Sequence, residues 1–354
     1  MSGRSFRVGA GLLLGGTLAA LATAFWLNLP PVDSPGGLVE IPPGASARVI
    51  ARQLKTAGHV RSSLWLEILS RVFRADQKLK AGVYRIAAHQ RADRILRALI
   101  LGRGATVRVT IPEGFAVWQM ADRLEGLGIC RAMDFLAEAT PWEGFLFPDT
   151  YFFDPGSPPE EPVRAFKERF VAEWGPVFHS ALVLGKVRFI EGARDPKEGD
   201  PEGRFRLEDG RPWTVRQAVT LASLIERETK RGDERTKVSA VYHNRLRKGM
   251  RLECDPTVQY ALGGWKNPLY KKDLIVDSPY NTYRRFGLPP GPIASPGRDS
   301  LAAALSPAPV DFLYFVSDGE GGHQFSATYE EHQRAVRQFR RGRKRIAERG
   351  PGLS

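Results

Sequence analysis

The stretch V-E-I-P-P-G-A-S-A-R-V-I-A-R-Q-L-K-T-A-G, residues 39–58, recurs seventy residues later as V-T-I-P-E-G-F-A-V-W-Q-M-A-D-R-L-E-G-L-G, residues 109–128. Each copy has a short apolar run, then a glycine (Gly44 or Gly114), then apolar residues at every third or fourth position. This pattern predicts a strand, a turn and an amphipathic helix that stops at the glycine closing the copy. A second helix is predicted after each copy, over residues 63–72 and 131–139.

The composition of the 354-residue chain is that of a folded protein of two or three domains, since 42% of its residues are hydrophobic and 26% are charged. The net charge of +13 predicts an anionic partner, either nucleic acid, anionic lipid or a cell-wall polymer. Cys130 and Cys254 lack the spacing of metal ligands, and the six histidines form no H-E-x-x-H motif. We therefore expect no metal and no cofactor, and a disulfide between the two cysteines stays open.

The N-terminal segment contains twenty consecutive uncharged residues, 8–27, which is long enough to cross a hydrocarbon core as a helix. Arg4 and Arg7 precede it, so the positive-inside rule predicts a cytoplasmic end over residues 1–7 and a single-pass anchor in the inner (plasma) membrane over residues 8–28. A cleaved signal peptide is the alternative, because A-T-A at residues 22–24 resembles a cleavage site. Both topologies place the body outside the cytoplasm, which argues against nucleic acid and favours wall glycan or a membrane surface.

The stretch L-A-S-L-I-E-R-E-T, residues 221–229, ends a helix predicted to begin near Pro212 and Thr214. On a helical wheel, Glu226 and Glu228 fall on the two flanks of the apolar stripe, where each side chain is half-buried. A half-buried carboxylate can act as an acid–base catalyst. An ordinary helix end with glutamates paired to basic neighbours is the alternative, and periodicity does not choose between the two glutamates.

Residues 278–297 are rich in Tyr, Asn, Pro and Gly, which excludes a regular helix or a central strand. Flat aromatic faces and amide groups suit a sugar-binding groove, and a rigid structural loop is the alternative. Further predictions are a loop and extended segment over 143–153, an exposed loop or hairpin insertion over 191–211, a buried strand over 312–316, a turn into a strand or helix start over 321–328, and helices over 161–174, 238–246, 300–305 and 334–349.

Several motifs that occur in order along the chain resemble the MltG (YceG-like) endolytic murein transglycosylase family. They are E-G-F-L-F-P-D-T-Y (143–151), A-S-L-I-E-R-E-T (222–229), D-P-T-V-Q-Y (255–260), Y-N-T-Y (280–283) and G-L-P-P-G-P-I (287–293). The strand–helix–helix repeat resembles LysM-type glycan-binding modules. The resemblance implies an α+β protein: an N-terminal transmembrane helix, a LysM-like α/β region over 38–140, and a mixed α/β catalytic domain over 141–346.

The resemblance also implies an activity. It is endolytic cleavage of the MurNAc–GlcNAc bond of peptidoglycan glycan strands, leaving 1,6-anhydro-MurNAc ends and terminating or trimming nascent strands. Partners implied by the family are the glycan strands, the inner membrane, and penicillin-binding proteins or the elongation machinery. Two alternatives stay open: a non-catalytic peptidoglycan-binding scaffold, and a muramidase that uses Asp255 as a second carboxylate beside Glu228.

The family motif places the catalytic residue at Glu228, the second glutamate of E-R-E-T. One carboxylate with a pKa near neutrality suffices, since it can protonate the leaving oxygen and then accept the proton of the C6 hydroxyl. Cys254 stands where the family commonly has a small hydroxyl residue, and we expect this difference to alter packing more than chemistry. The residues implied to bind substrate are Thr257, Gln259, Tyr280, Asn281, Tyr283 and His323.

Overall fold

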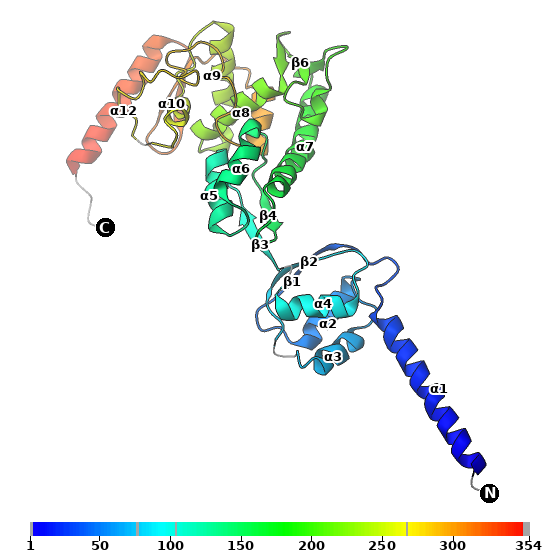
Figure 1. The fold of residues 1–354 in the computed structure, drawn as a ribbon. Coiled ribbons are helices and arrows are strands. Elements are labelled where there is room, and N and C mark those ends of the chain that lie inside the picture. The colour runs from blue at the N-terminus through cyan, green and yellow to red at the C-terminus, as the bar shows by residue number, and fades with distance from the viewer. Residues whose placement is uncertain (1–2, 76–77, 103–104, 267, 350–354) are drawn as a thin grey trace. The chain divides into compact units, whose positions relative to one another are not determined.

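The computed structural model describes residues 3–75, 78–102, 105–266 and 268–349 (Figure 1). The chain divides into two compact units, which are described separately. The first comprises residues 1–108 and 152–156, and the second comprises residues 109–151 and 157–354.

The first unit packs three short helices against a strand pair. Strands β1 (Gly37–Ile41) and β2 (Gly82–Ile86) are antiparallel, with Val39 opposite Tyr84. Val39, Tyr84 and the apolar faces of the helices form one buried cluster. The helices of this unit are α1 (Gly3–Asn28), α2 (Ala47–Thr56), α3 (Ser63–Val72) and α4 (Ala92–Leu101). Within the part of the chain that the structure describes, no helix has both the length and the hydropathy that a membrane span requires.

The predicted repeat is confirmed at the level of secondary structure. Each copy runs from a strand through a glycine with φ of +75°, Gly44 or Gly114, into a ten-residue helix, α2 or α5 (Val117–Gly126). Only glycine adopts this left-handed backbone without strain, which explains its place in both copies. The copies lie in different compact units, because the division falls between residues 108 and 109.

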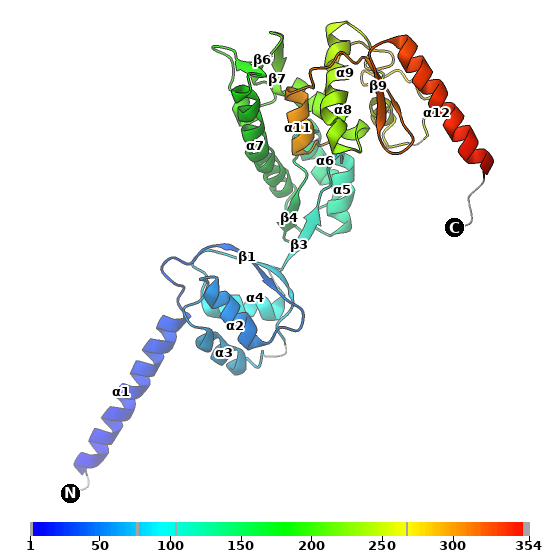
Figure 2. The same ribbon diagram turned by 180° about the vertical axis from the view of Figure 1, so that it is seen from behind.

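The second unit is built around α8 (Val215–Glu228), which packs against α9 (Arg235–Arg247) and α11 (Arg298–Leu305) (Figure 2). Every residue from Ala218 to Ile225 is buried, so α8 has no solvent-facing side along this stretch. The two hydroxyl residues within it are satisfied: Thr220 donates to the Arg216 carbonyl, and Ser223 donates to the Thr220 carbonyl. A buried central helix of this kind fixes the residues at its C-terminal end.

Two features differ from the sequence predictions in extent, and a third agrees with one of its alternatives. Helix α7 (Glu160–Val183) is longer than predicted. The 191–211 insertion contains β6 (Arg204–Leu207), which pairs antiparallel with β5 (Val187–Phe189) and β7 (Pro212–Thr214), as the predicted hairpin would. The predicted buried strand is β8 (Tyr314–Ser317), which is only half-buried because it pairs with a single partner, β9 (His323–Ser326). The other elements of the chain are β3 (Ala105–Thr110), α6 (Ala132–Ala139), η1 (Thr140–Trp142), β4 (Thr150–Phe153), η2 (Pro196–Glu198), η3 (Gly232–Glu234), α10 (Asp255–Ala261) and α12 (Tyr329–Arg349).

Candidate active site

Helix α8 carries Glu228 to the edge of the core. Its start is fixed by a capping box, in which the Thr214 hydroxyl accepts from the Gln217 N–H and the Gln217 side chain accepts from the Thr214 N–H. Its end is fixed by Thr229, whose backbone is extended and whose hydroxyl donates to the Ile225 carbonyl over 2.7 Å. Glu228 is therefore the last helical residue, where the buried helix meets a polar environment.

The Glu228 carboxyl has a proton affinity suited to acid–base chemistry. Burial raises its pKa from the ordinary value of 4.5 to about 7, and the nearby charge of Asp255 acts in the same direction. The Cys254 thiol, the Tyr242 hydroxyl and the Asp255 backbone N–H oppose the rise by favouring the ionised form. Near neutral pH this carboxyl can thus either give or take a proton.

Glu226, two residues earlier, is held by the protein itself. Its carboxylate accepts from the Gly297 N–H over 3.0 Å and from the Ser300 hydroxyl over 2.7 Å, and it lies 3.6 Å from the Arg235 guanidinium. These contacts attach α8 to the start of α11. The contacts of Glu226 agree with the predicted pairing to a nearby arginine, and the assignment of the catalytic role to Glu228 stays a prediction.

Residues 254–255 form the opposite side of the Glu228 site. Asp255 is the first residue of α10, and its carboxylate accepts from the half-buried Tyr283 hydroxyl over 2.6 Å. Cys254 is buried and its thiol is free. This thiol favours the ionised form of the Glu228 carboxyl, so Cys254 is a direct neighbour of the proposed catalyst, and the expectation that cysteine here alters packing more than chemistry stays a prediction.

Tyr242 was not singled out in the sequence, yet its hydroxyl is one of the groups that act on Glu228. It lies on α9, which packs against α8, and its side chain is 1% exposed. Its hydroxyl has no hydrogen-bond partner of regular geometry among the described residues. The sequence pattern V-Y-H-N-R could mark only a buried helix face, so this neighbour is visible only in three dimensions.

Two residues implied to bind substrate lie beneath the surface. Thr257 is buried and donates to the Cys254 carbonyl over 2.7 Å, with the Thr282 hydroxyl 2.9 Å away. Asn281 is buried, and its amide donates to the carbonyls of Leu274 and Val276. Their polar atoms are used within the protein: Thr257 connects α10 to Thr282 of the 274–283 loop, and Asn281 closes that loop on itself.

The other implied residues are partly exposed and have different neighbours. The Gln259 amide donates to the Lys266 carbonyl over 2.6 Å, and the Tyr280 ring lies 4.9 Å from the Tyr260 ring. His323 is fixed by Glu234, whose carboxylate lies 2.8 Å from the imidazole Nδ1 and accepts from the His323 backbone N–H. That pair connects the β8–β9 hairpin to η3, a structural contact.

A second carboxyl with a raised pKa lies under the aromatic residues. Burial raises the pKa of Glu143 to about 7, although its Oε2 accepts from the Val117 N–H over 3.2 Å and from the Tyr260 hydroxyl over 3.3 Å. Its Oε1 is buried without a hydrogen-bond partner in the described part of the chain. The adjacent Gly144 has a φ of +82°. The sequence marked Glu143 only as the start of a predicted loop and of a family motif, so this buried carboxyl was not predicted.

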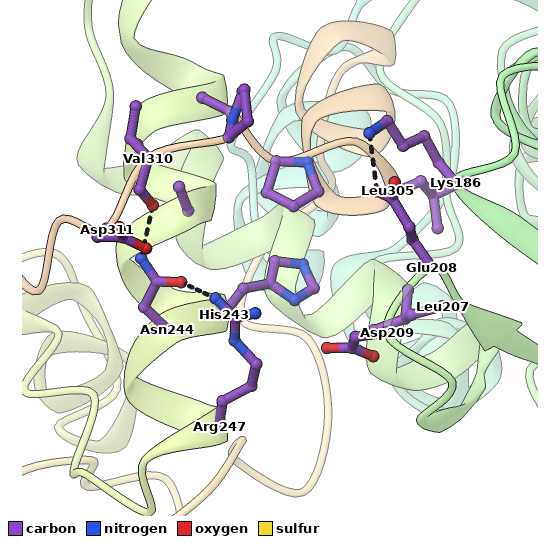
Figure 3. Close-up of a pocket in the computed structure, with 14 residues that line it drawn as sticks. Lys186, Leu207, Glu208, Asp209, His243, Asn244, Arg247, Leu305, Val310 and Asp311 are labelled. Carbon is purple, nitrogen blue, oxygen red and sulfur yellow. Dashed lines mark hydrogen bonds and ion pairs between the residues drawn. The ribbon is translucent and has the colours of Figure 1, made fainter.

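A cavity of about 430 Å³ adjoins another face of α9 (Figure 3). His243, Asn244 and Arg247 line it from α9, and an ion pair between Lys186 and Glu208 lines it from the other wall. None of its lining residues is among those predicted for the site. The cavity is therefore separate from the candidate catalytic residues, although His243 follows Tyr242 in the chain.

A carboxyl with a near-neutral pKa at the end of a buried helix is the kind of group that acid–base cleavage of a glycosidic bond requires. The chain belongs to the YceG-like family, whose model matches residues 39–338.

Individual relatives agree with this assignment. An endolytic murein transglycosylase of Bacillus subtilis is 29% identical over 330 residues, which is 85% of this chain and 84% of that protein. An endolytic murein transglycosylase of Streptococcus pneumoniae is 28% identical over 339 residues, 87% of this chain and 60% of that protein. The crystal structure of a yceG-like protein from Listeria monocytogenes matches with a TM-score of 0.52 and 30% identity, covering 85% of this chain and 99% of that one.

Proposed function

We propose that this chain is an endolytic murein transglycosylase in which Glu228 is the catalytic acid and base. The observation that carries the proposal is the contrast between the glutamates of E-R-E-T. Glu226 is held by a backbone N–H, a hydroxyl and a guanidinium, whereas Glu228 pairs with no cation among the described residues and has a pKa near 7. The family and the names of the relatives support the same activity.

In the proposed reaction, protonated Glu228 donates its proton to the glycosidic oxygen as the bond from the muramyl C1 to that oxygen breaks. The leaving saccharide departs with that proton. The Glu228 carboxylate then accepts the proton of the muramyl C6 hydroxyl, whose oxygen attacks C1 and closes the 1,6-anhydro ring. Glu228 is thereby reprotonated, so the cycle needs no water and no second carboxylate.

One observation favours the muramidase as a second candidate. Asp255 lies close enough to Glu228 for its charge to raise the Glu228 pKa, so a carboxylate pair is present. In a hydrolase Asp255 would act as nucleophile or base, whereas in the transglycosylase its charge and its contact with Tyr283 only shape the site. The chemical form of the product distinguishes the two.

Location and organisation form part of the proposal. Residues 8–28 anchor the chain in the inner membrane by a single span, with the N-terminus cytoplasmic and the body extracytoplasmic. Residues 38–140 act as a LysM-like region and residues 141–346 as the catalytic domain. Penicillin-binding proteins or the elongation machinery are the proposed protein partners, and Thr257, Gln259, Tyr280, Asn281, Tyr283 and His323 stay the predicted lining or support of the substrate groove.

The test is product analysis with the full chain, purified in detergent and incubated with peptidoglycan. Wild type is compared with Glu228→Gln, Asp255→Asn and the control Glu168→Gln, a 71%-exposed glutamate on α7. We expect anhydro-muramyl ends, lighter by one water than hydrolysed ends, from wild type, the control and the Asp255 variant, and none from Glu228→Gln. Reducing ends that vanish with Asp255→Asn would establish the muramidase instead. Binding of the polymer without any release would favour the scaffold.

A further inference from the structure

Four partly exposed aromatic side chains form a continuous row in the second unit. The ring of Trp118 lies 5.5 Å from that of Trp265 and 5.2 Å from that of Tyr260, which in turn lies 4.9 Å from Tyr280. The Trp265 indole N–H donates to Gln119 over 2.6 Å, which fixes the orientation of this ring. The row thus combines Trp118 from α5 with Tyr260 from α10 and with Trp265 and Tyr280 from the loops that follow α10.

The row ends at Arg227, the residue between the two glutamates. Its guanidinium carbon lies 3.7 Å from the centre of the Trp265 ring, and its Nη1 donates to the Gly114 carbonyl over 3.2 Å. Its Nε is buried without a hydrogen-bond partner, and no described carboxylate forms an ion pair with it, although Glu226 and Glu228 are its chain neighbours.

A partly buried guanidinium that no described carboxylate contacts at ion-pair distance is unfavourable for the fold alone. Burial lowers the pKa of Arg227, although the charges of Glu226 and Glu228 favour its ionised form and act in the opposite direction. Stacking on Trp265 recovers only about 0.5–2 kcal/mol. Such a group beside a catalytic residue is more readily explained by an anionic ligand that completes it.

We propose that Trp118, Tyr260, Trp265, Tyr280 and Arg227 form a subsite for a pyranose ring whose substituent bears a carboxylate. This inference rests on the proposed function and names the sugar that the site selects. Aromatic faces accept the apolar face of a pyranose, and a guanidinium recognises a carboxylate through paired N–H groups. In a glycan strand of alternating amino sugars, only the muramyl residue carries such a group, either on its lactyl ether or on the peptide attached there.

The position of the subsite fits this selection. Arg227 immediately precedes Glu228 on α8, and Tyr260 lies on the same seven-residue helix as Asp255. At 1.5 Å rise per residue, Asp255 and Tyr260 are separated by about 7–8 Å along that helix, so the row begins within roughly one to two sugar lengths of Glu228. A muramyl residue bound here would set the register of the strand, and hence which glycosidic bond meets the proton donor.

The test measures binding by calorimetry in the full chain carrying Glu228→Gln, so that no ligand is cleaved. Three oligosaccharides of equal length are compared: peptide-bearing strands, amidase-treated strands that retain only the lactyl carboxylate, and chito-oligosaccharide, which has no carboxylate. Adding Arg227→Gln to this variant should weaken binding of at least one of the two muramyl ligands about tenfold, as expected for loss of a charged hydrogen bond, and leave binding of chito-oligosaccharide unchanged. Arg227→Lys should restore part of the difference, and Trp265→Ala should weaken all three.

The outcomes separate the subsite from the catalytic proposal. If Arg227→Gln weakens binding of only one muramyl ligand, the subsite is supported. Loss for the peptide-bearing strand assigns the recognised carboxylate to the peptide, and loss for the amidase-treated strand assigns it to the lactyl group. An equal loss for chito-oligosaccharide, or no loss for any ligand, in a variant whose thermal unfolding matches its parent, overturns it. Wild type that releases no anhydro ends while Arg227→Gln still discriminates would overturn the catalytic function and leave the subsite intact.

Discussion

Replacing Glu228 by glutamine is expected to stabilise the protein, and to do so only at higher pH. In the folded chain the carboxyl has a pKa of about 7, whereas exposed in the unfolded chain it has the ordinary value of 4.5. The folded state therefore binds this proton more tightly. Its contribution to the free energy of unfolding is fully present below pH 4.5 and is lost as the pH rises through 7.

The size of the effect follows from that difference. A separation of about 2.5 pKa units corresponds to about 3.5 kcal/mol at 1.4 kcal/mol per unit. Glutamine resembles the protonated carboxyl and does not ionise, so its burial costs no additional free energy at high pH. We therefore expect the variant to match wild type near pH 4.5 and to gain up to about 3.5 kcal/mol at pH 8, or roughly 7–14 °C in Tm for a unit of this size.

The assay is thermal unfolding of the full chain in detergent, followed by circular dichroism at pH 4.5 and pH 8. Glu143 titrates in the same range but is present in both proteins, so its contribution cancels in the comparison. Glu226→Gln is the matched control on α8. It disturbs a network that holds Gly297 and Ser300, and should destabilise the protein at both pH values.

A Glu228→Gln variant that gains no stability between pH 4.5 and pH 8 would refute the reasoning. It would mean that the carboxyl titrates near its ordinary pKa in the folded chain. The carboxyl would then be ionised at neutral pH and could not donate a proton to a leaving oxygen efficiently. The result would therefore remove the physical basis of the catalytic proposal without any activity being measured.

Three further predictions test the surroundings of the site. Cys254→Ser offers a stronger hydrogen-bond donor to the Glu228 carboxylate and should lower the Glu228 pKa. The alkaline limb of the pH–rate profile, where Glu228 loses the proton that it must donate, should then move to lower pH; an unchanged profile would show that the thiol does not act on Glu228. Thr257→Val leaves buried hydrogen-bond partners unsatisfied and should lower the free energy of unfolding by about 1–3 kcal/mol, measured by urea titration, while the folded variant keeps its activity. Normal stability with lost activity would instead indicate that Thr257 contacts substrate. Gly144→Ala places a methyl group 2.3 Å from the Pro292 side chain and should unfold far more easily than Gly185→Ala, where nothing lies within 4 Å; similar midpoints for the two would contradict the packing at this turn.

Local patterns were sufficient to predict much of the fold. The repeat could be predicted because its signals lie within twenty residues: a glycine with positive φ, apolar residues at every third or fourth position, and a glycine that ends the helix. The start of α8 was readable for the same reason, since Thr214 and Gln217 form its capping box three residues apart. Features that depend only on neighbours in the chain are expressed in the sequence itself.

The features that were missed depend on contacts between distant segments. The seven residues of α10 are too few for a helical period, so D-P-T-V-Q-Y was readable as a motif but not as a helix. Asparagine is a residue type that suits sugar binding, but the amide of Asn281 donates hydrogen bonds to two carbonyls of its own loop. Trp118 and Trp265 are 147 positions apart in the sequence and meet only in the folded unit.

The E-R-E-T stretch shows most directly what separates a structural from a catalytic carboxylate. The Glu226 carboxylate is already occupied by a backbone N–H, a hydroxyl and a nearby guanidinium, which tie it to the start of α11. Glu228, the proposed catalyst, pairs with no cation in the described part of the chain, and burial brings its pKa to about 7, so its acid and base forms are nearly equal in energy at neutral pH. A transglycosylase needs that balance in a single group, because the same carboxyl must first lose a proton and then regain one. Two glutamates on one helix thus receive opposite roles from the segments that fold against them.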